Sequence, residues 1–459
     1  MSSSIRSGIL TLLHTACGAG ILAMPYAFKP YGLIPGVAMI VFCGLCSMAG
    51  LLLQSKVTKY VPERNASFFA LTQVTNPKLS VIFDFAIAIK CFGVGVSYMI
   101  VVGDVMPQIL STFTDHSILV NRNFNITVVM LCIVSPLCFI KNLNSLRYAS
   151  MLAISSVVYL CILVLIHFVV PSDDVTKLKG EVSWFFPHES NSSQLSTLPI
   201  FVFAYTCHHN MFSVINEQYN TSFKSIKYIA MLSMLFACCL YVVIGGTGYL
   251  TFGDEITGNI ITLYPQSMAT TIGRIAIVFL VTLAFPLQCH PARASISHII
   301  HYFKAEEVKP ALNTLERTTL MDNEVSPSPQ SLLEMEIPTE EIIEEEYPGQ
   351  QQHFQPVPLT PNMFIIITSG ILIAAYLLAI SIQSLAHVLA IVGATGSTSI
   401  AFILPGVFGF QLIGSEYESL TSMPPRTRLL KGLAMLLTLW GLFVMVTSLF
   451  AALFLGASH

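Results

Sequence analysis

The chain alternates between long apolar runs and short polar connections over most of its length. A helix needs roughly 20 apolar residues to cross a bilayer. A membrane β-barrel would instead show short segments in which apolar and polar residues alternate. The pattern therefore predicts an all-α polytopic membrane protein with about eleven transmembrane helices. The expected spans are residues 6–28, 32–58, 79–113, 124–141, 146–170, 194–219, 224–252, 268–291, 362–382, 384–412 and 429–455.

Composition agrees with this pattern. Of the 459 residues, 54% are hydrophobic and only 10% are charged, whereas a soluble domain carries about 25% charged residues. The first apolar run is too long for the core of a cleavable signal peptide, so we expect it to be the first span. All eleven cysteines fall in apolar runs. We expect them to be buried as small apolar residues, with no metal site.

Most lysines and arginines fall in alternate connections, which fixes the expected orientation. Basic residues concentrate on the cytosolic side of membrane proteins. We therefore place the N-terminus in the cytosol and, because the number of spans is odd, the C-terminus on the other side. Only five basic residues fall on that other side: Lys29, Arg122, Lys177, Lys179 and Arg274.

Residues 301–360 differ in kind from the other connections. They contain "SPSPQ" and "PTEEIIEEEYPGQQQ" and are rich in acidic residues. Such a segment buries too little apolar surface to fold alone. We expect an acidic disordered cytosolic loop between residues 1–300, with eight spans, and residues 361–459, with three. A cytosolic regulator could bind this loop. On the opposite side, Asn191 starts an Asn-Ser-Ser glycosylation sequence.

The first span contains weak helix formers at its centre. Its sequence "LTLLHTACGAGILAMPYAF" holds His14, Gly18, Gly20 and Pro25 within an apolar run. Inside hydrocarbon, a break in the helix is tolerated only where the freed backbone groups face protein, water or a ligand. Close packing of helices through small residues would also explain Gly-Ala-Gly. Span 1 alone leaves both interpretations open.

The sixth span favours a helix break. It reads "LPIFVFAYTCHHNMFSVINEQ" and places His208, His209 and Asn210 in mid-span. Polar residues at this depth usually serve function. Interrupted helices at corresponding positions of two halves indicate a transporter with inverted repeats. Spans 1–5 and 6–10 would be the repeats, with span 11 added. The positive N-terminal ends of the half-helices suit a carboxylate and the C-terminal carbonyls suit an ammonium, as in an amino acid.

Three motifs resemble the amino acid/auxin permease family, most closely its fungal vacuolar branch. They are "GAGILAMPYAF" in span 1, "FAYTCHHNMFSVINE" in span 6 and "VTLAFPLQCHPAR" in span 8. The resemblance implies a leucine-transporter-type fold of five plus five helices and one extra helix. It also implies alternating access, usually coupled to protons, and a multi-pass protein of the vacuolar membrane.

The resemblance also implies site residues. The substrate-binding residues would be Thr15, Ala16, Cys17, Gly18, Ala19, Gly20 and Ile21 in span 1, and Phe203, Ala204, Tyr205, Thr206 and Cys207 in span 6. Thr282 lies where sodium-coupled relatives place a hydroxyl near the ion. Those relatives carry asparagine where this chain has His14. Imidazole suits a hard cation less well than an amide oxygen, and it titrates near physiological pH. His14, with His208, is therefore a candidate for proton coupling, although His14 could equally be a neutral packed residue.

Span 3 adds further candidates. Ser97 and Tyr98 lie at its middle and could line the substrate cavity. Lys90 lies within the membrane and needs a polar partner. Asp84 lies six residues away, which places the two on different faces of the helix. Lys90 is also the one intramembrane basic residue able to recognise an acidic side chain.

These observations favour a secondary transporter that exports acidic or neutral amino acids from the vacuole, with protons as the coupling ion and lipid as its surroundings. Import by proton antiport and an amino acid sensor on the same fold are the alternatives. An enzyme is not expected, because a haem or di-metal centre would need more histidine pairs at helical spacing. A channel would need a ring of charges or a filter loop. No cofactor and no nucleic-acid partner are expected.

Overall fold

The computed structural model describes residues 4–140, 147–187, 194–219, 221–322, 359–418 and 422–455, and these residues form helices and connections without a β-strand. Eight helical segments are long and apolar enough to cross a membrane. They are α3 (Leu33–Val57), α5 (Ser80–Leu110), α8 (Arg147–Val169), α12 (Phe223–Phe252), α13 (Met268–Asp322), α14 (Pro361–Ser381), α15 with α16 (Leu385–Val392 and Leu404–Leu412), and α17 (Pro425–Phe450).

Two of the other three expected spans are divided helices, and the third, Arg122–Cys138, is a shorter apolar helix. Span 1 consists of α1 (Ile5–Ala16) and α2 (Gly20–Ala27), which are bent by 57° relative to each other. Span 6 consists of α10 (Gln194–Ala204) and α11 (His208–Glu217). Span 4 consists of α6 (Arg122–Val129), a π-helical turn (Met130–Val134) and α7 (Ser135–Cys138). Each predicted span thus coincides with helices, and the predicted all-α membrane fold is confirmed.

The connection after span 8 differs from the expectation. Helix α13 continues past residue 291 to Asp322, so residues 301–322 are helical where an unfolded loop was expected. The stretch is rich in alanine, leucine, glutamate and lysine, which all favour helix. Two short helices also lie in connections, α4 (Phe68–Val74) and α9 (Asp173–Lys177). Residues 323–358 and Asn191 lie outside the described residues, so the rest of the acidic loop and the glycosylation sequence remain predictions.

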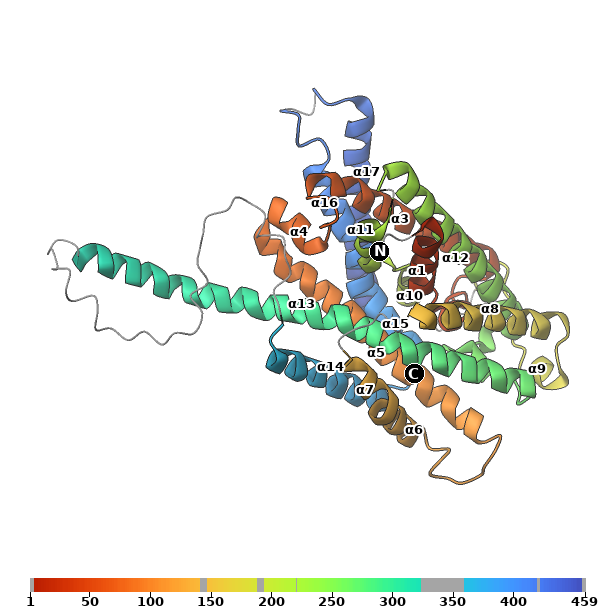
Figure 1. Cartoon of the computed structure of the whole chain (residues 1–459). Helices are drawn as coiled ribbons and strands as arrows, with labels where there is room; N and C mark the ends of the chain where they lie inside the picture. Colours follow the sequence, from red (N-terminus) through yellow and green to blue (C-terminus); the bar gives the residue numbers. More distant parts are fainter. Residues whose placement is uncertain are drawn as a thin grey trace.

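The helices form two groups that face each other (Figure 1). In the first, α12 packs against α1, α2 and α3, while α10 packs against α2 and α11 against α1 and α3. In the second, α5 runs along α13, and α14 and α6 lie beside this pair. Helices α15 and α16 join the groups through contacts with α10, α5 and α3. Both interrupted spans therefore belong to one group and meet the other across a shared boundary.

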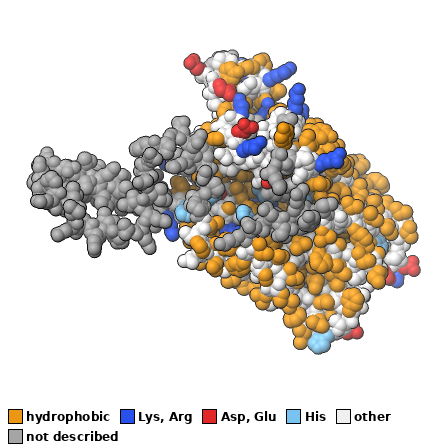
Figure 2. Space-filling view, in the orientation of Figure 1, with side chains coloured by type: hydrophobic (Ala, Val, Ile, Leu, Met, Phe, Trp, Pro, Cys, Tyr) orange, Lys and Arg blue, Asp and Glu red, His pale blue; other side chains and the backbone are white. Residues whose placement is uncertain are grey.

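The outer surface fits a hydrocarbon environment. Figure 2 shows apolar side chains over most of the body, with charged side chains gathered at the upper end and at the lower and right-hand edges. Large apolar residues are exposed on many helices, among them Phe85, Leu436 and Phe450. A water-soluble protein rarely exposes so extended an apolar surface, so these faces are expected to contact lipid.

Candidate functional site

The helix of span 1 is broken at residues 17–19. The Cys17 N–H donates to the Leu13 carbonyl at 2.8 Å, which closes α1, and α2 begins at Gly20. A Cβ atom on Gly18 would lie 3.1 Å from the Tyr98 hydroxyl oxygen, and one on Gly20 would lie 3.1 Å from the Ala204 Cα. Glycine at these positions allows close approach of other chain segments. Both interpretations of the motif therefore hold, because it breaks the helix and also permits close packing.

The helix of span 6 is broken at Tyr205–Cys207, between α10 and α11. The two breaks meet at Tyr241 of α12. Its hydroxyl lies 2.9 Å from the carbonyl oxygen of Ala16 and 2.6 Å from that of Ala204. Ala16 ends α1 and Ala204 ends α10, so one side chain contacts the terminal carbonyls of both half-helices. Free carbonyls at a buried helix end need such a partner.

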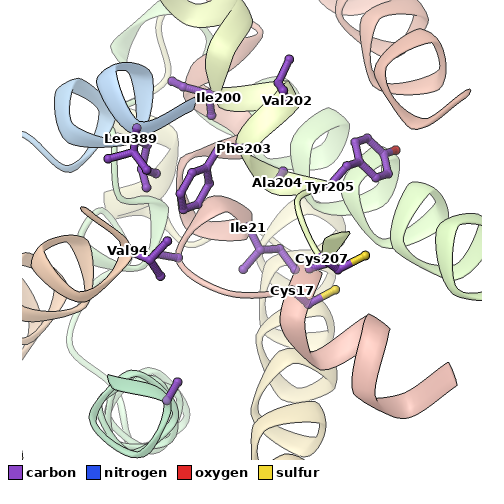
Figure 3. Packing of buried hydrophobic residues seen from close by; sticks show 14 of the residues in the cluster. Cys17, Ile21, Val94, Ile200, Val202, Phe203, Ala204, Tyr205, Cys207 and Leu389 are labelled. Carbon is purple, nitrogen blue, oxygen red and sulfur yellow. The ribbon is translucent and has the colours of Figure 1, made fainter. Parts of the chain in front are cut away.

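On the side of α2 and α10, the structure is closed. Figure 3 shows Phe203 clustered with Ile21, Val94 and Leu389 beside the breaks. All four are buried, and Phe203 is only 7% exposed. Apolar packing of this kind leaves no route for a polar solute. This half of the molecule therefore separates the breaks from the surface beyond it.

On the side of α1 and α11, a polar cavity of about 300 Å³ lies between the two helix groups. Ser213 and His290 are exposed at its edge, whereas Tyr98 lies deep in the protein. The cavity therefore extends from the surface toward the breaks. The residues that line it are Thr11, His14, Thr15, Tyr98, His209, Asn210, Ser213, Ala284, Leu287, Gln288, His290 and Pro291.

Two hydrogen bonds organise the α1 wall of this cavity. Asn210 of α11 donates to the Thr15 hydroxyl at 2.8 Å, which joins the two half-helices directly. The Thr15 hydroxyl donates in turn to the Thr11 carbonyl at 2.7 Å. The side chain that holds α1 and α11 together is therefore itself part of the cavity surface.

Lys90 lies behind the opposite wall. Its ammonium nitrogen is 3.1 Å from the Gln288 side-chain oxygen, and 3.3 and 3.2 Å from Nδ1 and Nε2 of His209. Lys90 is buried, with 2% of its surface exposed. Gln288 and His209 both line the cavity. The polar partners that we expected for Lys90 are therefore the side chains of Gln288 and His209 at the cavity wall.

The structure divides the predicted site residues into three sets. His14, Thr15 and Tyr98 line the cavity. The remaining residues predicted to bind substrate in spans 1 and 6 form the two breaks or flank them. The last set consists of Ser97 and Thr282, which do neither, and His208, which flanks the span 6 break as the first residue of α11 but does not line the cavity.

The three side chains of this last set face other parts of the protein. The Ser97 hydroxyl donates to the Val94 carbonyl of its own helix at 2.7 Å. His208 Nε2 lies 3.0 Å from the Ser47 carbonyl of α3. The Thr282 hydroxyl is buried and has no hydrogen-bond partner among the described residues. Their predicted roles in substrate binding and proton coupling therefore have no direct support from the cavity geometry.

Sequence reasoning marked His209 and Asn210 as functional polar residues of span 6 without assigning them to the substrate site, and it missed Gln288. A signal was present in span 6, because residues 209 and 213 are four apart and residues 210 and 213 are three apart, which places polar groups on one helix face. Gln288 gave no comparable signal. The cysteines also differ in part from expectation, because Cys132 and Cys239 are exposed on the outer surface. No cluster of His, Cys, Asp and Glu able to hold a metal ion occurs in the described part of the chain.

Two interrupted spans that meet beside a polar cavity in a polytopic helical protein are typical of transporter architectures. Residues 1–453 match the family model described as transmembrane amino acid transporter protein, and the chain belongs to this family. The family predicted from the three motifs is confirmed. Its members are transporters and not enzymes.

The relatives of this chain include fungal and animal proteins. It is 58% identical to vacuolar amino acid transporter 6 and 52% identical to vacuolar amino acid transporter 5 of Saccharomyces cerevisiae. The first alignment covers 99% of each chain and the second 100%. It is also 26% identical to sodium-coupled neutral amino acid transporter 7 of Danio rerio, over 67% of each chain.

Proposed function

We propose that this protein is a proton-coupled carrier that moves amino acids across the vacuolar membrane by alternating access, with net export from the vacuole to the cytosol. The observation that carries this proposal is the polar cavity between the two helix groups, which leads to two helix breaks held by Tyr241. The two yeast relatives, named as vacuolar amino acid transporters, support both the substrate class and the membrane.

The breaks provide groups of both signs for a zwitterionic substrate. The N-terminal end of α2, at Gly20, carries the positive end of a helix dipole and suits the α-carboxylate. The carbonyl ends of α1 and α10 suit the α-ammonium. Breaks at corresponding places in spans 1 and 6 support a five-plus-five inverted repeat. Neutral or acidic amino acids fit this arrangement, since Lys90 is a cation just behind the cavity wall.

The structure corresponds to one end of an alternating-access cycle. The cavity reaches the surface at Ser213 and His290, on the half formed by α1 and α11. Beyond the breaks, the cluster around Phe203 closes the route. With the N-terminus in the cytosol, as the basic residues predict, this is the state that releases substrate to the cytosol.

Proton coupling rests on the titratable groups of the cavity. His14 of α1 and His209 of α11 both line it. Among the described residues, the cavity lining includes no carboxylate that could serve as a sodium ligand. Hard cations prefer oxygen ligands, above all carboxylates. The lining therefore favours protons over sodium.

The test is transport by the purified protein in liposomes. Vesicles loaded with labelled amino acids at internal pH of about 5.5 and diluted to external pH of about 7 should lose label, and a protonophore should reduce the loss. Gradient-driven uptake into the acidic lumen would instead establish import by antiport. Binding without flux in either direction would establish a sensor.

A further inference from the structure

Lys90 is a buried amine without an anionic partner in the described part of the chain. Four ion pairs occur there, and none includes Lys90. The nearest acid on the same helix, Asp84, is 3.4 Å from His298 instead. An ammonium in the protein interior requires compensation by an anion or by strong hydrogen bonds. Lys90 has only the Gln288 oxygen and the imidazole of His209.

Among the described residues, the surroundings of Lys90 and His209 contain other titratable groups but no carboxylate. The π-helical turn Gly393–Ser397 packs on the Lys90 backbone, because a Cβ atom on Gly396 would lie 2.7 Å from the Lys90 backbone nitrogen. This turn carries no titratable side chain. His208, next to His209, is directed toward Ser47. The other titratable groups facing the pair or its cavity are Cys91 and Tyr98 of α5, Cys207 of the span 6 break, His14 of α1, and Cys289 and His290 of α13.

A lysine amine and an imidazole in contact form a site whose protonation depends on both groups. One proton more than the neutral pair gives a single positive charge, which the Gln288 oxygen and the cavity can stabilise. A second added proton would place two positive charges about 3.2 Å apart in a low-dielectric interior, which is strongly unfavourable. A carboxylate entering the cavity would offset that second charge.

We propose that Lys90 and His209 together form the proton-binding site of the carrier, and that the pair accepts its second proton only while a substrate carboxylate occupies the cavity. This assignment rests on the proposed function and identifies its coupling group. The proton comes from water on the acidic side and binds a ring nitrogen of His209. Lys90 retains its own proton and the substrate remains a carboxylate. When the substrate leaves, the proton returns to water through the cavity.

This proton site couples proton movement to substrate movement without using a carboxylate side chain of the protein. Without substrate, the second proton is repelled, so the empty carrier does not leak protons. Without the second proton, a carboxylate in the cavity faces less positive charge and binds more weakly. Each ligand therefore raises the affinity for the other, as linkage requires.

The assignment is tested in liposomes that contain one of four proteins: wild type, Lys90→Met, His209→Gln or Lys90→Arg. Three quantities are measured with labelled glutamate and labelled alanine: accumulation driven by a pH gradient, exchange at equal pH on both sides, and proton flux evoked by substrate. We expect Lys90→Met and His209→Gln to lose gradient-driven accumulation and evoked proton flux by about tenfold or more. Exchange needs no net proton transfer, so it should fall much less than accumulation and show a raised KM for substrate, because the carboxylate faces less positive charge in both variants. Lys90→Arg keeps the fixed positive charge that the assignment gives to Lys90, so it should retain exchange and most of the gradient-driven accumulation.

Lys59→Met and His387→Gln are matched controls, because both residues lie outside the cavity. The outcomes separate the two proposals. Wild type without any gradient-driven flux would overturn the proposed function. Gradient-driven accumulation with normal proton flux in Lys90→Met would overturn the Lys90–His209 assignment and leave the proposed function standing. If Lys90→Met loses exchange because it misfolds, His209→Gln tests the assignment, since it leaves the Lys90–Gln288 bond in place. Intact proton coupling in His209→Gln would overturn the assignment.

Discussion

The hydroxyl of Tyr241 lies 2.6 Å from the backbone carbonyl oxygen of Ala204, the last residue of helix α10. The same hydroxyl lies 2.9 Å from the carbonyl of Ala16, the last residue of α1. Tyr241 is fully buried. Two half-helices from distant parts of the sequence therefore end against one side chain of a third, continuous helix, which fixes the position of both breaks.

Tyr241→Phe is expected to destabilise the protein and reduce transport. The substitution keeps the aromatic ring and removes the hydroxyl donor, so the Ala204 carbonyl loses this partner, while the Ala16 carbonyl still accepts from the Gly18 N–H at 2.8 Å. Such a loss costs about 1–3 kcal/mol. The thermal unfolding midpoint in detergent and the maximal transport rate should both fall. Tyr228→Phe, at an exposed position of the same helix, is the control and should change neither; equal behaviour of the two variants would contradict the role of Tyr241.

Gly20→Val is expected to push the two breaks apart. A Cβ on Gly20 would lie 3.1 Å from the Ala204 Cα and 3.1 Å from a Phe203 ring carbon, so a branched side chain has no room. Overpacking of this kind costs about 1–3 kcal/mol. Thermal stability and substrate exchange should both decrease. Gly370→Val is the control, because a Cβ there meets nothing within 4 Å. Wild-type behaviour of Gly20→Val would show that α2 and α10 do not need this close contact.

The broken spans could be predicted because their signals are local. Glycine in span 1 and consecutive polar residues in span 6 are unfavourable inside a membrane helix wherever the rest of the chain lies. The continuation of α13 past residue 300 was not predicted, because acidic composition suggested an unfolded loop. Helix-forming residues that follow directly on a formed helix extend it without a new nucleation step.

The residues that line the cavity were predicted only in part, because the direction of each side chain depends on its position around the helix and on tertiary contacts. His208 and His209 are neighbours in sequence, but successive residues of a helix point about 100° apart. His208 therefore contacts α3 and His209 lines the cavity. The contacts of Lys90 with His209 and Gln288 span 119 and 198 residues of sequence. A single sequence carries no information on such pairs.

The hydrogen bond between Asn210 and Thr15 is expected to couple α1 and α11. Thr15→Val and Asn210→Ala each remove one partner and should each lower thermal stability and raise the KM for substrate. In a double-mutant cycle, the coupling free energy should be about 0.5–1.5 kcal/mol. Thr447→Val is the control, because the Thr447 hydroxyl donates only to its own helix, to the Phe443 carbonyl. Strictly additive effects would mean that the 2.8 Å contact contributes nothing to either property.

His14→Asn is expected to weaken proton coupling while preserving the fold. His14 is the one titratable residue that α1 contributes to the cavity lining in the described part of the chain. Asparagine retains polarity but cannot carry a proton at physiological pH. Efflux driven by a pH gradient should therefore fall and its pH profile should flatten, while exchange at equal pH continues. His387→Gln, outside the cavity, should behave as wild type. Unchanged gradient-driven efflux in His14→Asn would exclude His14 from coupling and leave His209, in contact with Lys90, and His290 as the histidines of the cavity lining.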